Sequence, residues 1–218
     1  MKKHLFFVLT SGLIFAILIS NAFSFIESGL ALDKLRGSVL RLHILANSDS
    51  DYDQQMKLKV RDALLESGIL SGAADLDEAE DIAEKRLRDI ETLAELTLEE
   101  NGCNYSVKAS LTDMDFDERQ YGEMTMPKGK YKALRVEIGK AEGHNWWCVM
   151  YPPLCIPAAC EVEADEETAE CFFDEKDRDI LEKPQKYKVR SALWVELKQL
   201  TDKIKKEKKK EVKTNGRN

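Results

Sequence analysis

An uncharged apolar run near the N-terminus limits what this 218-residue chain can fold into. After Lys2, Lys3 and His4, no charged side chain occurs before Glu27. The 22 residues between, LFFVLTSGLIFAILISNAFSFI, are long enough to span a bilayer. A basic start followed by such a run also describes a secretory signal, and Ser20-Asn21-Ala22 offers small residues for cleavage after Ala22. We therefore predict that residues 1–26 are a signal peptide or a membrane anchor.

The direction of export is indicated less directly. Basic residues lie close on both sides of the apolar run, because Lys34, Arg36 and Arg41 follow it. The positive-inside rule therefore gives no clear orientation. Signal-like segments normally send the following chain outward, so we expect residues 27–202 to form one exported domain.

Charge is unevenly distributed along the chain. The net charge of −7 argues against a general nucleic-acid binder, which would carry a basic face. Residues 161–182 hold eleven acids and two bases, and residues 203–218 hold eight bases and two acids. Like-charge blocks usually stay in water, so we expect an acidic loop and a solvated basic tail. The tail could instead contact an anionic membrane surface or the cell wall.

Alternating and helical apolar patterns predict an α+β fold. Strands are expected over 39–46, 104–111, 131–139 and 146–151, helices over 51–67, 77–101 and 186–206, and irregular chain over 112–129. In the first strand Leu40, Leu42 and Ile44 share one face and Arg41 and His43 the other, which is typical of a half-buried strand. We predict a largely antiparallel sheet of about four strands with helices on one face.

The segment NSDSDYD, residues 47–53, is expected to start the helix over 51–67. Its alternating acids resemble a calcium loop, but the required Gly and Glu positions hold other residues in either register. Helix capping is the better interpretation, with Ser50 as N-cap and Asp53 favourable at the positive helix end. The apolar stripe of this helix is expected to comprise Tyr52, Met56, Val60 and Leu64.

The segment GHNWWCVMYPPLC, residues 143–155, is the strongest candidate for a functional site. Adjacent residues of a strand point to opposite faces, so Trp146 and Trp147 cannot easily enter the same core. Tryptophan on the outer face is typical of an interface anchor, and we favour a partner-binding surface over plain burial on two sides.

Catalysis and metal binding are weaker interpretations. A nucleophilic cysteine needs a base within reach, but His144 and Cys148 would lie about 13 Å apart along a strand. The cysteines and histidines match no zinc spacing, and no cofactor motif is present. Five cysteines cannot form a complete disulfide framework. A Cys148–Cys155 disulfide is geometrically feasible, although unpaired thiols are the default expectation.

Three segments resemble one family. LRLHILANSDSDYDQQMKLKVRDALL (40–65), MPKGKYKALRVEIGKAEGHNWWCVMYPPLC (126–155) and VRSALWVELKQL (189–200) are similar to the opening motif, central signature and closing helix of the stage II sporulation protein R family. The acidic stretch 161–182 and cysteines 103, 160 and 171 have no place in that pattern.

This resemblance implies a signalling protein rather than an enzyme. Family members are made in the forespore and exported into the space between its membrane and that of the mother cell. There they activate a membrane-embedded, aspartic-type protease of the mother-cell membrane, the partner expected here, which then processes pro-sigma-E. The family supplies no catalytic residues.

The expected contacts with the protease come from two segments. They are Asn145, Trp146, Trp147, Cys148, Pro152 and Pro153 of the WWC-PPLC segment, with Asn47 and Asp49 of the capped loop. Trp147 and Asn145 are the first candidates. The competing hypothesis is an exported enzyme that uses Cys148 with His144 on the protease or the cell wall.

Overall fold

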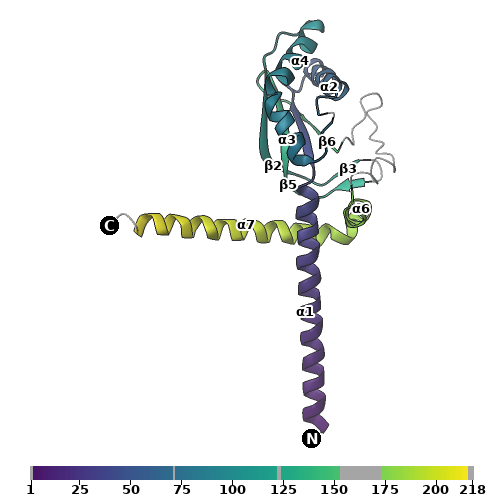
Figure 1. The fold of residues 1–218 in the computed structure, drawn as a ribbon, viewed down its shortest axis with the longest axis vertical. Coiled ribbons are helices and arrows are strands. Elements are labelled where there is room, and N and C mark those ends of the chain that lie inside the picture. The colour runs from purple at the N-terminus through teal and green to yellow at the C-terminus, as the bar shows by residue number, and fades with distance from the viewer. Residues whose placement is uncertain (1, 71, 122–123, 153–172, 216–218) are drawn as a thin grey trace.

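The N-terminal apolar run forms the first part of one long helix. The computed structural model describes residues 2–70, 72–121, 124–152 and 173–215. Helix α1 (Lys2–Arg36) projects from the rest of the molecule, and it is long and apolar enough to cross a membrane (Figure 1). It continues ten residues beyond the predicted boundary at residue 26, and its last turns bury Ala31, Leu32 and Leu35 against the folded domain.

A four-stranded sheet forms the centre of the domain, as predicted. Its strands are β1 (Leu40–Leu45), β2 (Val107–Phe116), β5 (Gly129–Ile138) and β6 (Asn145–Tyr151), in the order β2-β5-β1-β6. Strand β1 runs parallel to β5, while β2–β5 and β1–β6 are antiparallel. The α+β class with a mostly antiparallel sheet is therefore confirmed.

Three helices cover one face of this sheet. Helix α2 (Asp51–Glu66) begins at the predicted N-cap, where the Ser50 side chain accepts a hydrogen bond from the Asp53 N–H. Met56, Val60 and Leu64 are buried, but Tyr52 is exposed. Tyr52 is therefore not part of the core stripe, because it stands in the first turn at the edge of the packed surface.

The helix predicted over 77–101 is two helices. They are α3 (Leu76–Lys85) and α4 (Leu87–Glu100), and Arg86 between them leaves the helical conformation with φ −103° and ψ 13°. The Arg86 guanidinium donates to the carbonyl of Ile69 (3.2 Å), which holds the bend. The break allows Ala79 and Ala83 of α3 and the apolar face of α4 to follow a twisted sheet separately.

The opposite face of the sheet is also covered, which corrects the prediction of helices on one face. A hairpin of β3 (Arg119–Tyr121) and β4 (Met124–Met126), helix α6 (Glu175–Glu182) and the end of α1 enclose a second core there. Residues 112–129 are thus mostly strand, which corrects the prediction of irregular chain. The prediction missed β3 and β4 because three-residue strands are too short to show alternation. Residues 175–182 are helical rather than loop, since Ile180 and Leu181 are buried in this core. Residues 161–172 lie outside the described residues.

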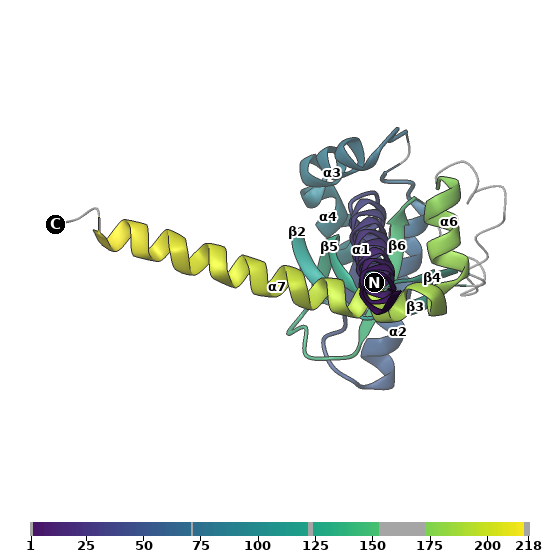
Figure 2. The same ribbon diagram turned by 90° about the horizontal axis from the view of Figure 1, so that it is seen from below.

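The C-terminal helix leaves the domain. Helix α7 (Pro184–Asn215) starts beside α6, crosses α1 and extends sideways, as the view along α1 in Figure 2 shows. It includes most of the predicted basic tail. Apolar residues repeat along α7 at helical spacing, but Leu193, Leu197, Leu200 and Ile204 are exposed, so in the described part of the chain this row is not packed into a core.

Candidate partner-docking surface

Two loops that resemble the family motifs lie side by side at one end of the sheet. Strand β1 leads into residues 46–53, and residues 139–145 lead into β6, its antiparallel neighbour. The Gly143 N–H donates to the Ala46 carbonyl (2.9 Å) and the Glu142 N–H to the Asn47 carbonyl (3.3 Å). We call residues 46–53 and 139–145 together the paired-loop surface.

Asn47 joins the two loops rather than pointing to solvent. Its side-chain amide donates to Asp53 Oδ2 (2.8 Å), and its Oδ1 accepts from the Lys140 N–H (3.0 Å). Ser48 Oγ donates to the same Asp53 oxygen (2.5 Å). Burial alone would raise the pKa of Asp53, but the hydrogen bonds from Ser48, Asn47 and Tyr105 outweigh it and hold the pKa below its ordinary value. Asp53 is therefore a charged centre around which the loop folds.

Two glycines permit the close approach of the loops. Gly139 has φ +58°, and a Cβ there would lie 2.4 Å from Asn47 Oδ1. A Cβ on Gly143 would lie 2.2 Å from the backbone oxygen of Ser48. Any other residue at either position would push the loops apart.

Asp49 and His144 form the exposed part of this surface. Asp49 Oδ1 accepts from the His144 N–H (2.6 Å) and lies 2.5 Å from His144 Nδ1. Behind them the buried Lys57 ammonium donates to the His144 carbonyl (3.0 Å). Burial lowers the pKa of Lys57, and the negative charge of Asp49 opposes that shift. Lys57 thus fixes the backbone of this surface from the protein interior, and the exposed side of the surface is polar, with Asn145 next to His144.

The two tryptophans are both half-buried, one on each face of the sheet. Trp146 packs against the core under α2, with the Arg61 guanidinium 4.4 Å from its ring centroid. Trp147 packs against the second core, stacked on His43 with ring centroids 4.2 Å apart. Neither residue is a fully exposed anchor, because the face expected to meet solvent carries a core of its own. Each side chain remains partly exposed.

Cys148 and His144 do not form a catalytic pair. Cys148 is buried and disulfide-bonded, which corrects the expectation of an unpaired thiol. His144 bonds instead to Asp49, at the far end of β6. Residue spacing alone could not decide between these states. Pro152 is buried in a groove beside Tyr151 and Asp75, whereas Pro153 and Cys155 lie outside the described residues.

Sequence reasoning missed a buried cation behind this segment. Arg41 is fully buried, where a solvent-facing position was expected. Its Nε donates to the Cys148 carbonyl (3.0 Å) and its Nη2 to the Tyr121 hydroxyl (2.5 Å), and its guanidinium lies 4.4 Å from the Phe116 ring centroid. Burial lowers the pKa of Arg41, while Tyr121 and Tyr131 oppose the shift. In the sequence, Phe116 and Tyr121, which lie in the segment predicted to be irregular, were the signal that could have indicated an aromatic environment for Arg41.

His43, the other polar residue on that face of β1, is also buried. Burial lowers its pKa and favours the neutral ring. Asn145 lies near enough to oppose the shift, although neither ring nitrogen completes a hydrogen bond of regular geometry. Among the described residues, no group of three His, Cys, Asp or Glu side chains is arranged to hold a metal ion.

Comparison with known proteins identifies relatives of the chain. The family model for stage II sporulation protein R matches residues 36–161, which include the paired-loop surface and β6 but not α7. The chain is 34% identical over 156 residues to stage II sporulation protein R of Bacillus subtilis (strain 168), covering 68% of this chain and 70% of that protein. No solved structure matches the chain.

Proposed function

The chain belongs to the stage II sporulation protein R family, and on this basis we propose that it is an exported sporulation signal that activates a membrane-embedded, aspartic-type protease. That protease would then process pro-sigma-E in the mother cell. The family match is the observation that carries the proposal. It covers more than half of the chain and both motifs that form the paired-loop surface.

Export into the space between the forespore and mother-cell membranes is supported by two features of the chain. Helix α1 begins with Lys2, Lys3 and His4 and continues as an apolar run of spanning length. Cys148 is disulfide-bonded, a state that persists in oxidising compartments and is rare in a reducing cytosol. Both features fit a domain that acts outside the cytoplasm.

Action by binding is supported by the construction of the paired-loop surface. Its backbone is fixed by the Asn47–Asp53 bonds and by Lys57, so little conformational entropy would be lost when a partner docks. Asp49, His144 and Asn145 are exposed on it, and they are the residues we propose to contact the outer domain of the protease. The half-buried Trp146 and Trp147 would supply apolar contact at its edge.

A binding signal activates its target only if it prefers the active form. We therefore propose that the paired-loop surface binds the protease more tightly in its active state. Cys148 and Pro152 would act by shaping β6 and its exit rather than by touching the partner, since both are buried.

The test is co-expression of the exported chain, the protease and pro-sigma-E in a non-sporulating host, scored by cleavage of the pro-sequence. Wild type, Asn145→Ala and His144→Ala would be compared, with Lys59→Ala on the exposed side of α2 as matched control. The expected result is cleavage with wild type and Lys59→Ala, and reduced cleavage with Asn145→Ala and His144→Ala.

A separate arm addresses the thiol-enzyme alternative. Cys103, the free described cysteine, is buried, so alkylation of the folded protein should leave cleavage unchanged. Loss of cleavage after alkylation would revive the cysteine-dependent enzyme if circular dichroism is unchanged and mass spectrometry identifies Cys148 as the alkylated residue. Absence of cleavage with wild type would remove the assignment to this protease.

A further inference from the structure

We propose that α7 is a membrane-surface helix whose exposed apolar stripe lies on the bilayer that α1 enters. The stripe consists of Leu193, Leu197, Leu200 and Ile204, and the exposed Lys203 and Lys205 beside it would contact anionic lipid headgroups. This inference does not depend on the signalling function proposed above. Helix α7 also lies beyond the residues that the family model matches.

The stripe is a continuous apolar row that neither core of the described residues covers. Its members follow one another at spacings of four, three and four residues, which places them along one side of the helix. Each side chain is between 45% and 56% exposed. Scattered exposed leucines are common on soluble proteins, but an unbroken row on a helix that projects from the domain indicates an apolar partner.

Contacts with α1 fix the level at which α7 lies. Trp194 Nε1 donates to Asp33 Oδ2 (2.8 Å), and Lys198 Nζ forms an ion pair with the same oxygen (2.8 Å). The Trp194 ring meets Phe25 edge-on with centroids 5.7 Å apart, and it sits so close to Gly29 that a Cβ there would clash with it. Phe25, Gly29 and Asp33 of α1 lie on both sides in sequence of Glu27, the first charged residue after the apolar run. A bilayer that holds the apolar run would therefore have its surface at the level of α7.

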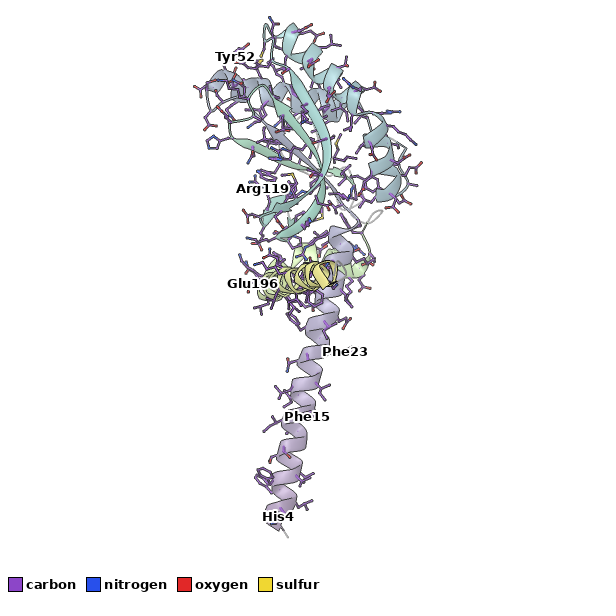
Figure 3. All side chains as sticks on the ribbon, turned by 90° about the vertical axis from the view of Figure 1, so that its left-hand side faces the viewer. His4, Phe15, Phe23, Tyr52, Arg119 and Glu196 are labelled. Atoms are coloured by element: carbon purple, nitrogen blue, oxygen red, sulfur yellow. The ribbon has the colours of Figure 1, made fainter. Side chains whose placement is uncertain are left out.

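The stripe faces the part of α1 that would be in the membrane. Trp194 and Lys198 point toward α1, while Glu196 lies on the side of α7 away from it (Figure 3). Successive residues of a right-handed α-helix are about 100° apart around its axis, so the stripe lies on neither of these two sides but on a third side between them. Because α7 runs across α1 and is right-handed, the stripe side faces the N-terminal half of α1, and the opposite side of α7 faces the domain.

Charge favours an anionic bilayer over other apolar partners. Residues 203–218 carry eight basic and two acidic side chains, and the described members Lys203 and Lys205 are exposed beside Ile204. Polybasic segments next to a membrane are attracted to anionic headgroups, and helices with an apolar face and many lysines lie in the interfacial plane. A second copy of the chain would bring two such basic segments together, which electrostatic repulsion opposes.

Photocrosslinking of the full chain in lipid vesicles tests this arrangement. The photoreactive residue p-benzoylphenylalanine replaces Leu197 on the stripe or, as matched control, Asp202 on the opposite side of the same helix. Vesicles contain phosphatidylcholine with or without phosphatidylglycerol, and adducts are identified by mass spectrometry. In the anionic vesicles, position 197 should give lipid adducts at least about tenfold more often than position 202, because an interfacial helix buries one face.

Each other outcome overturns part or all of the proposal. Equal lipid adducts at both positions would mean that α7 has no fixed orientation, and adducts with a second protein chain would identify an interface between copies. An unchanged yield at position 197 without phosphatidylglycerol would refute the role of the headgroups. Leu200→Asp, with helicity checked by circular dichroism, should reduce the lipid adducts at 197, and an unchanged yield would refute burial of the stripe.

Discussion

Substitution of Gly143 is the most direct test of the paired-loop surface. Gly143 lies in the loop before β6, and a Cβ there would stand 2.2 Å from the Ser48 carbonyl oxygen and 3.0 Å from the Ala46 side chain. Neither neighbour is the end of a flexible side chain that could turn away at low cost. Gly143→Ala therefore requires the two loops to separate.

The size of the effect follows from the bonds that such a movement would break. A shift of roughly 1 Å is needed to reach ordinary van der Waals contact, and overpacking of this kind costs about 1–3 kcal/mol. The same shift weakens the Gly143–Ala46 and Glu142–Asn47 backbone hydrogen bonds, each worth about 1 kcal/mol. We expect the free energy of unfolding to fall by about 2–4 kcal/mol.

Chemical denaturation of the full chain in detergent micelles, followed by tryptophan fluorescence, measures this change. Gly102→Ala is the matched control, because Gly102 has φ +74° but no atom within 4 Å of an added Cβ. Its free energy of unfolding should fall only by the cost of the backbone strain, about 1 kcal/mol. In the co-expression assay, Gly143→Ala should reduce pro-sigma-E cleavage while Gly102→Ala should not.

The reasoning fails if Gly143→Ala is no less stable than Gly102→Ala, because the loops would then be free to separate. It fails in a different way if Gly143→Ala is destabilised as expected but cleaves pro-sigma-E like wild type. The steric account would then stand, and the surface would not be the docking site.

Three further outcomes are expected from buried polar groups. Burial lowers the pKa of His43, so the unfolded chain binds a proton at a higher pH than the folded chain, and stability is lost as pH falls below the ordinary histidine value of about 6.5. Denaturation series from pH 7 to 5 should show this slope, and His43→Phe should reduce it by up to about 1.4 kcal/mol per pH unit. Arg41→Ala should lower the unfolding free energy by about 3–5 kcal/mol, whereas Arg41→Met, which keeps the volume and removes an unpaired charge, should cost less than half of that in the same denaturation assay. Asp53→Ala leaves the Asn47 and Ser48 donors without their acceptor and should cost about 2–3 kcal/mol, with partial recovery in Asp53→Asn, as read from thermal midpoints.

The main strands and the capped helix α2 could be predicted because their patterns are local. Alternation identified β1, β2 and β5, and Ser50 identified the start of α2. The second core could not be predicted in the same way. It is assembled from Phe116 and Tyr121 together with Phe173, which is far from them in sequence, and these residues lie in segments without a clear period.

That residues 47–53 and 143–155 carry a partner-binding surface stays a prediction. The structure places residues 46–47 beside residues 142–143, so the start of the second segment neighbours the first. The division of labour among them depends on tertiary contacts. Asn47 proved to be a link between loops, His144 a partner of Asp49, and Arg41 a buried cation, none of which follows from spacing.

The contact between α1 and α7 lies entirely downstream of the candidate cleavage site. Phe25, Gly29 and Asp33 all follow Ala22, so removal of residues 1–22 by a signal peptidase would leave the crossing intact. Cleavage would then replace permanent anchoring by the apolar run of α1 with reversible membrane binding by α7, and the orientation of the domain on the bilayer would not change. Processing would therefore set how long each molecule remains at the bilayer that it first entered.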